Sequence, residues 1–331
     1  MRKQGAHSVA NKGHGFAHKH KLARRIALAA GCAAALALAL VIVFVPVPQQ
    51  ARDAASDRLQ EVMAAVDHAN THVAQLSELL AGGLDDAAVQ QAQQLVEGKA
   101  EAEGELAAAL DDLNTFRRNL DAQDARAAAL LEQGIQARRD MLENGTAVLE
   151  ASVRAYRLSG DVQKLWQALL DGHDALTASA AQLQVGTTPA VKKALASDEK
   201  AKETYQTALG LMDDLRAQAP GYAFSEERSY ADKQVQAADE AIAADKALLA
   251  GDTEAAQQHM AAYQNAAVEA ASIAESLPGT ADDLLKSIYY SLGTDGLSVA
   301  DAEAAYADAA SRTAHCDEKL AAYRTSKGYQ S

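Results

Sequence analysis

Residues 59–80 read LQEVMAAVDHANTHVAQLSELL, and this stretch decides the fold class. Apolar residues recur every seven positions on two registers, at Leu59, Val66, Val73 and Leu80 and at Val62, Ala69 and Leu76. Spacing of this kind places one apolar stripe along an α-helix, as in a coiled coil. The stretch therefore predicts a long helix that buries one face against other helices.

The same repeat resumes beyond Gly82-Gly83. Its two registers hold Leu106, Leu113, Leu120, Ala127 and Met141, and Ala109, Phe116, Leu130 and Ala137. If residues 84–158 formed one continuous helix, it would be about 110 Å long at 1.5 Å per residue. Asn144-Gly145 is a turn-forming pair that could break such a helix. We therefore expect a long coiled-coil-like helix with a possible turn at that pair.

Composition extends this helical interpretation to the whole chain of 331 residues. Alanine accounts for 78 residues, whereas there are only 5 prolines, 4 phenylalanines and 1 tryptophan. Alanine is the strongest helix former, and strand-forming residues are scarce. An all-β protein and an ordinary α/β enzyme are both excluded by this composition, and we expect an all-α protein.

Charge divides the chain sharply. Residues 1–25 carry seven basic side chains and no acidic one, and the first carboxylate is Asp53. Removing these seven positive charges from the net charge of −14 leaves −21 for the rest. Residues 26–45 form an uncharged apolar run of about the length that crosses a bilayer. Basic residues before such a run keep the N-terminus in the cytoplasm, so we expect a single-pass signal-anchor helix and an extracytoplasmic remainder.

Two alternatives to a membrane anchor stay open for this apolar segment. It could be a cleaved secretory signal, with cleavage after Ala51. Ala29-Ala30-Gly31-Cys32 resembles a bacterial lipobox, although the usual leucine is missing. A stripe of small residues at every fourth position could pair two membrane helices. If the segment is retained, residues 26–45 bind the lipid bilayer and the basic arm binds anionic lipid headgroups.

Helix-capping signals divide the rest of the chain into shorter elements. Asp161 and Thr188-Pro189 could begin two helices, Asp252 a third, and Thr280 with Asp283 and Ser298 with Asp301 have capping-box spacing. We expect about eight helices after the membrane segment, joined by short connections as antiparallel neighbours. The predicted segments are a basic arm (1–25), a membrane anchor (26–45), membrane-proximal long helices (49–158) and a distal helical bundle (159–331).

Few residues suggest chemistry. His68 and His72 lie four positions apart, so both imidazoles could face one metal ion, with Glu61, Asp67 or a carboxylate of another helix completing its ligands. The heptad pattern places His68 on the solvent side and His72 at the flank of the core, where the two side chains are simply exposed. No catalytic motif or cofactor fingerprint is present, and we expect neither an enzyme nor a bound cofactor. The negative charge beyond Asp53 disfavours nucleic acid.

Tyrosines offer the remaining signal for a ligand site. They recur through the C-terminal helices, at Tyr205, Tyr230, Tyr263, Tyr289, Tyr290, Tyr306 and Tyr323. Their rings could line a pocket or supply a core that is otherwise poor in large residues. We expect a non-enzymatic interaction or scaffold protein of the cell envelope, with a protein partner or a homodimer. A ligand-sensing or solute-binding domain that works with a separate membrane partner is one alternative, and a metal-binding envelope protein is another.

Overall fold

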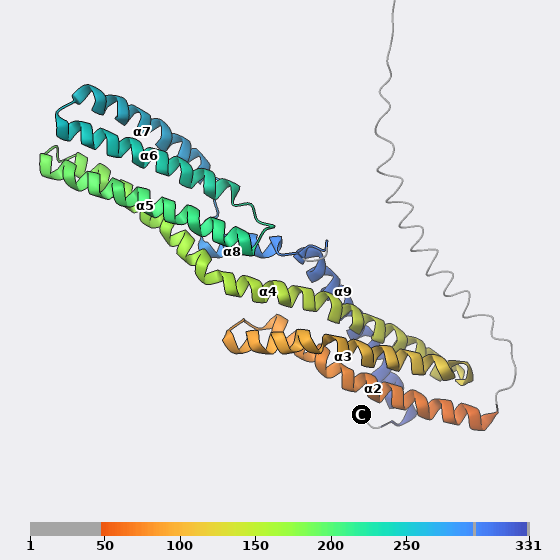
Figure 1. The fold of residues 1–331 in the computed structure, drawn as a ribbon. Coiled ribbons are helices and arrows are strands. Elements are labelled where there is room, and N and C mark those ends of the chain that lie inside the picture. The colour runs from red at the N-terminus through yellow and green to blue at the C-terminus, as the bar shows by residue number, and fades with distance from the viewer. Residues whose placement is uncertain (1–47, 294–295, 330–331) are drawn as a thin grey trace, which may run out of the picture. The chain divides into compact units, whose positions relative to one another are not determined.

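A computed structural model describes residues 48–293 and 296–329, and this part of the chain is built from α-helices without a β-strand. The helices, which keep the labels of Figure 1, are α2 (Gln49–Ala81), α3 (Asp86–Phe116), α4 (Ala122–Leu183), α5 (Thr188–Gln218), α6 (Ser225–Ala250), α7 (Thr253–Ala274), α8 (Ala281–Ser291) and α9 (Val299–Lys327). A single 3-10 turn, Arg117–Asn119, joins α3 to α4. The prediction of an all-α protein is confirmed.

The chain divides into two units, Met1–Arg52 and Asp53–Ser331. The predicted basic arm (1–25) and membrane segment (26–45) belong to the first unit and lie outside the described residues. Among the helices that are described, none combines the length and the apolar character needed to cross a membrane. The single-pass anchor therefore stays a prediction, and the rest of this section concerns the second unit.

One hydrophobic core joins α2, α3, the first half of α4 and α9, and we call these elements the first bundle. The heptad positions of α2 are its centre: Leu59, Val62, Val66, Ala69, Val73 and Leu76 are all at most 3% exposed. On α3, Leu106, Ala109, Leu113 and Phe116 are buried as their register predicts. The predicted apolar stripes are thus correct within α2 and α3, where helices of the same chain cover them, whereas Leu120 of the second stripe lies outside any helix.

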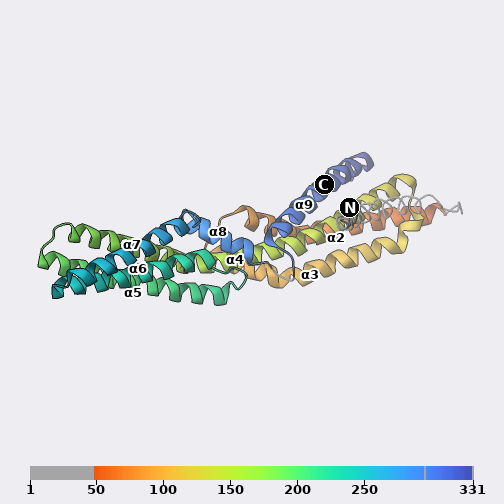
Figure 2. The same ribbon diagram turned by 90° about the horizontal axis from the view of Figure 1, so that it is seen from above.

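A second core joins the C-terminal half of α4 to α5, α6, α7 and α8, and we call these elements the second bundle. The two cores meet along α4, because residues up to Val153 pack in the first and residues from Ala151 onward pack in the second. Figure 2 shows α4 continuing from one bundle into the other. One helix therefore belongs to both bundles.

Two expected helix boundaries are wrong. Helix α4 runs through Asn144-Gly145 and through Ser159-Gly160 without interruption, and neither Asp161 nor the Asn-Gly pair ends or begins a helix. A Cβ atom on Gly145 would lie 2.8 Å from atoms of Leu76 and Tyr306, so this glycine permits close packing of helices and makes no turn. The real interruption is at Arg117–Asn119, and the Asp121 carboxylate then caps α4 through the amides of Gln123 and Asp124.

Helix α9 lies in a different place from the one expected. The sequence grouped residues 159–331 into one distal bundle, yet Ala309, Leu320 and Tyr323 of α9 are buried in the core of the first bundle. Contacts that stabilise this placement include the Tyr306 hydroxyl donating to Ser77 Oγ at 2.9 Å and the Arg324–Asp67 ion pair at 2.7 Å. The first bundle is therefore closed by a helix from the far end of the chain.

The capping predictions for the later helices are largely confirmed. Thr280 accepts a hydrogen bond from the Asp283 amide and Ser298 accepts one from the Asp301 amide, both at 3.1 Å, so both residues act as N-caps. Their hydroxyls in turn donate to the side chains of Asp283 and Asp301. Asp252 caps α7 through the amide of Ala255. The cap of α5 is Thr187, one residue earlier than expected.

Candidate functional site

The second bundle buries two carboxyl groups that face each other across α5 and α6. Asp198 is 1% exposed and Asp245 is 0% exposed. None of their four carboxyl oxygens has a partner with hydrogen-bond geometry among the described residues. Burying a polar group without a hydrogen-bond partner lowers the stability of the folded state. Two such carboxyl groups in one core are unusual, and we therefore treat them as a candidate functional site.

The pKa of Asp198 is raised to about 7, chiefly by burial and with a smaller contribution from the adjacent Asp245 carboxylate. Burial likewise raises the pKa of Asp245 to about 6, although a protonated Asp198 opposes part of that rise. The Ser179 hydroxyl of α4 also opposes the rise at Asp198. Two carboxylates held together away from water cannot both ionise at low cost, so the pair retains a proton at pH values where an exposed aspartate has lost it.

Further polar side chains continue from the acid pair along the same core. Tyr205 of α5 is fully buried with its hydroxyl unpartnered, and its ring meets the Tyr230 ring edge to face at 6.1 Å between centroids. The Gln234 amide donates to the Tyr230 hydroxyl at 3.0 Å. Burial raises the pKa of Tyr263 on α7, as does the charge of Asp198. We call Asp198, Asp245, Ser179, Tyr205 and Tyr230 the buried polar cluster, and the half-buried Tyr263 lies beside it.

The sequence places these side chains inside because of their heptad positions. The buried face of α5 follows alternating steps of four and three residues, through Ala194, Asp198, Ala201, Tyr205, Ala208, Met212 and Leu215. Asp198 thus occupies a core position that would suit leucine. Our sequence analysis missed Asp198 and Asp245. An acid at a heptad core position within an alanine-rich helix was the signal that could have found them.

Tyr205 and Tyr230 do fill the core, as one of the two sequence interpretations expected. A Cβ atom on Gly172 of α4 would lie 2.7 Å from the Tyr205 ring, so glycine there makes room for it. Tyr323 is also buried, whereas Tyr290 is 42% exposed. The tyrosines thus serve chiefly as packing residues in their separate bundles.

His68 and His72, the predicted metal ligands, meet different partners on α3. The His68 side chain is 82% exposed, and its Nδ1 lies 3.5 Å from Glu105 Oε2. The His72 Nε2 donates to the Leu95 carbonyl at 3.0 Å. No group of three or more metal-ligating side chains occurs within residues 48–293 and 296–329. Metal binding by the pair stays a prediction, which the zinc content of the His68→Ala/His72→Ala variant would test.

The described surface has two open grooves. One, of about 540 Å³, lies between α2 and α3 and is lined by Glu61, His68, Glu105 and Asp112 among others. The other, of about 400 Å³, lies between α4 and α8 beside Tyr289 and Lys286. Neither groove reaches the buried polar cluster. A ligand held in either groove would therefore lie on the outer surface of a bundle.

Cys316 of α9 carries no sign of reactivity. It is 3% exposed, and burial raises the pKa of its thiol, so the thiolate is disfavoured. It packs in the first bundle against Gly134 of α4. This agrees with a small apolar role.

A second buried polar group, Arg138 of α4, is fully partnered. Its guanidinium donates to both Asp317 oxygens of α9 at 2.7 and 2.8 Å, to Asn70 Oδ1 of α2 at 3.1 Å and to the Gly134 carbonyl at 3.2 Å. Because these partners come from three helices, Arg138 aligns them in the first bundle. This cluster is a structural one, in contrast to the unpartnered acids of the second bundle.

Comparison with known proteins adds no functional information. The chain matches no known protein family, and neither a characterised protein nor a solved structure is significantly similar to it. The arrangement of its own residues is therefore the basis for a functional proposal.

Proposed function

We propose that this protein is a non-enzymatic interaction or scaffold module of the cell envelope, anchored by residues 26–45 with its helical bundles outside the membrane. The observation that carries this proposal is that the buried apolar residues pack into two hydrophobic cores that share α4, with open grooves between α2 and α3 and between α4 and α8. A protein with filled cores recognises partners through its outer helix faces. The partner would be another protein or a second copy of the chain.

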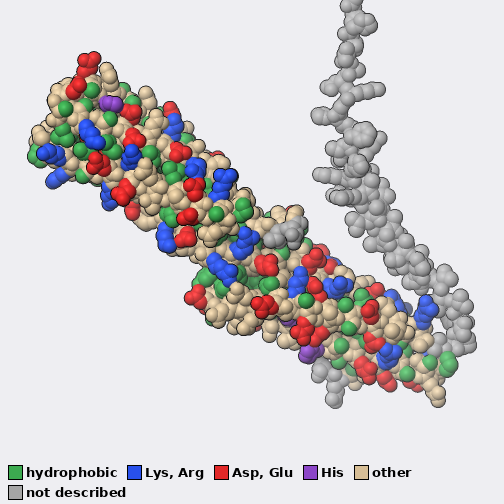
Figure 3. Space-filling model, in the orientation of Figure 1, with side chains coloured by type: hydrophobic (Ala, Val, Ile, Leu, Met, Phe, Trp, Pro, Cys, Tyr) green, Lys and Arg blue, Asp and Glu red, His purple; other side chains and the backbone are tan. Residues whose placement is uncertain are grey.

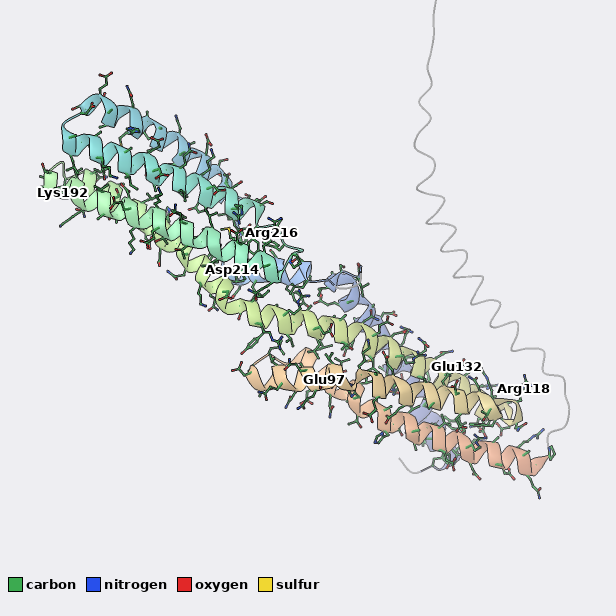
Figure 4. The ribbon with its side chains drawn as sticks, viewed as in Figure 1. Glu97, Arg118, Glu132, Lys192, Asp214 and Arg216 are labelled. Atoms are coloured by element: carbon green, nitrogen blue, oxygen red, sulfur yellow. The ribbon has the colours of Figure 1, made fainter. Side chains whose placement is uncertain are left out.

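The outer surface suits reversible protein contacts. Acidic and basic side chains are intermixed on the face shown in Figure 3. Figure 4 shows charged side chains on the outer surfaces of α3 and α5, among them Glu97, Lys192, Asp214 and Arg216, and all four are exposed. A surface with both signs interspersed recognises complementary charge patterns and gives specificity more than affinity.

Ligand sensing is the second candidate function, and the buried polar cluster is the observation that favours it. Unpartnered carboxyl and hydroxyl groups in one core respond to protons or to small polar molecules that reach them. The acidic surface beyond residue 52 does not favour a nucleic-acid partner.

The experiment that tests the interaction proposal uses the full chain in its native membrane. Photo-crosslinking residues would replace exposed Ala65 on α2 and exposed Val268 on α7, one in each bundle, and the buried Ala109 would serve as the control. We expect discrete crosslinked species from at least one exposed position and none from Ala109. Light scattering of the detergent-solubilised chain would identify a homodimer.

A monomeric chain without a discrete adduct from either exposed position would contradict the interaction proposal. Saturable binding of a small molecule by the same preparation would then favour the sensing candidate. A complex of fixed stoichiometry would support the scaffold.

A further inference from the structure

The acid pair lies at the contact through which α6 and α7 attach to the rest of the second bundle. Asp198 belongs to α5 and Asp245 to the last turns of α6, and both are covered completely by the packing of these helices. Around them the contact is made by small side chains, since the buried apolar residues of α6 other than Tyr230 are all alanines. The buried residues of α7 are Ala256, Ala266 and Ala270.

Alanine contacts of this kind bury little apolar area per residue. Burial contributes about 25 cal/mol per Å², so α6 and α7 are stabilised less strongly per helix turn than the leucine-rich α2 and α3. Local opening in proteins begins in elements with few large buried contacts. The α6–α7 hairpin is therefore weakly attached to the second bundle, so one buried charge at the contact is enough to loosen it.

We propose that Asp198 and Asp245 form a pH switch that holds the α6–α7 hairpin on α5 while the pair carries a proton and loosens it when both carboxyls ionise. When the pair holds one proton, one carboxyl group is neutral and only one negative charge is buried. When the last proton leaves to solvent, two carboxylates remain in a core without a partner, and hydrating them requires α5 and α6 to separate.

The groups that surround the pair do not supply a compensating positive charge. Ser179 faces it from α4 and Tyr263 from α7, and both are neutral hydroxyls. The nearby cations already face surface carboxylates: Lys246 lies 3.9 Å from Glu199, Lys202 lies 2.6 Å from Asp239, and His259 Nδ1 lies 2.7 Å from Glu240. Ionisation of both acids is therefore not offset by these neighbours.

The direction of the effect follows from the raised pKa of both acids. Between the ordinary aspartate pKa and about 7, the folded pair binds more protons than the unfolded chain does. The attachment is then strongest below the ordinary aspartate pKa and weakens as the pH rises from there to about 7. Each pKa unit of elevation corresponds to about a tenfold change in the opening equilibrium.

Hydrogen exchange of the full detergent-solubilised chain at pH 5.5 and pH 8.0 tests the proposal. After correction for the intrinsic exchange rate at each pH, we expect the amides of α6 and α7 to be at least about tenfold less protected at pH 8.0. The amides of α2 and α3 provide the internal reference. In Asp198→Asn/Asp245→Asn, which is neutral at both pH values, this difference should fall to less than about twofold.

Two variants control for other titrating groups. Asp232→Asn removes an exposed acid of α6, and His259→Gln removes the histidine of α7; both should keep the wild-type pH difference. The proposal is overturned if wild-type protection of α6 and α7 is the same at both pH values, since that comparison needs no variant. It is also overturned if the double variant keeps the difference or if His259→Gln abolishes it.

Discussion

Single residues determine how each bundle treats buried polarity. Arg138 reaches partners on α2, α4 and α9, so its desolvation is offset by four hydrogen bonds. Asp198 and Asp245 have none and respond by retaining a proton. A charged residue at a core position therefore has different effects in the two bundles. Arg138 aligns the helices of the first bundle, whereas Asp198 and Asp245 make the second bundle sensitive to pH.

Replacing Arg138 by alanine should destabilise the first bundle by about 2 kcal/mol, because Asn70 and Asp317 lose their donor and a cavity remains. Arg312 of α9 is the matched control, since its ion pair with Asp140 joins the same two helices but its side chain is 45% exposed. Arg312→Ala should cost at most about 1 kcal/mol. Urea unfolding of both variants measures the difference, and equal losses would refute the assigned role of Arg138.

Asp198→Asn should stabilise the protein at pH 8 by about 2 kcal/mol and change little at pH 4. The raised pKa of Asp198 means that the wild-type carboxyl group is ionised in the core at pH 8 at a cost, whereas asparagine remains neutral. Thermal melting at both pH values gives the comparison. A lower melting temperature of the variant than of the wild type at pH 8 would contradict the prediction that ionised Asp198 destabilises the fold.

At the scale of elements, glycines within helices serve packing. Gly145 and Gly160 both lie inside α4, yet a Cβ atom would meet Leu76 and Tyr306 at Gly145 and nothing within 4 Å at Gly160. The dipeptides Asn144-Gly145 and Ser159-Gly160 look alike in the sequence, because each combines a turn-forming residue with glycine. The tertiary contact, which the sequence does not display, separates a glycine required for close approach from one that is merely tolerated.

Gly145→Ala should therefore destabilise the first bundle by about 1–3 kcal/mol through overpacking. Gly160→Ala should stabilise α4 by about 0.5–1 kcal/mol, since alanine is the better helix former and space is available. Denaturant midpoints of the two variants provide the measurement. If Gly160→Ala were as harmful as Gly145→Ala, the packing explanation for Gly145 would fail.

For the whole molecule, the return of α9 to the first bundle makes that bundle depend on the end of the described chain. Ala309, Cys316 and Leu320 bury their side chains there, and Tyr323 donates to Asp124 at 2.9 Å. The first bundle therefore cannot be completed until residues beyond 300 are present. Its helices are separated in sequence by the entire second bundle.

Removing residues 309–331 should expose the core of the first bundle while the second keeps its own. We expect amide protection of α2 and α3 to fall and that of α5 to persist, which hydrogen exchange with peptide-level resolution would record. Replacing the exposed Val268 by serine is the control for a change outside the first bundle. Persistent protection of α2 and α3 in the truncated chain would contradict the role of α9.

Membrane topology is a prediction for the whole chain that the sequence alone supplies. Seven basic residues before the apolar run 26–45 predict that the C-terminal bundles lie outside the cytoplasm. Alkaline phosphatase fused after residue 331 should be active, and a fluorescent protein that folds only in the cytoplasm should be dark at the same position. Reversed signals would disprove the predicted orientation.

The sequence by itself determined the helical class, the buried faces of α2 and α3 and most helix caps. Those features depend on local propensity and on apolar spacing within one helix, such as Leu59 to Leu76, and so can be predicted without knowing any partner. It also indicated that the tyrosines could supply core volume, which Tyr205 and Tyr230 do.

Only the tertiary structure decided that α4 is continuous, that α9 closes the first bundle, and that Asp198 meets Asp245. Each of these depends on contacts between residues far apart in the chain. The sequence around Gly145 predicts a turn, and only the contact with Tyr306, 161 positions later, shows that this glycine is needed for packing. Asp198 likewise has the sequence of a surface acid and is buried only because α6 covers it. Local sequence patterns contain no information on which helix lies opposite, because that choice is made by the packing free energy of the whole bundle.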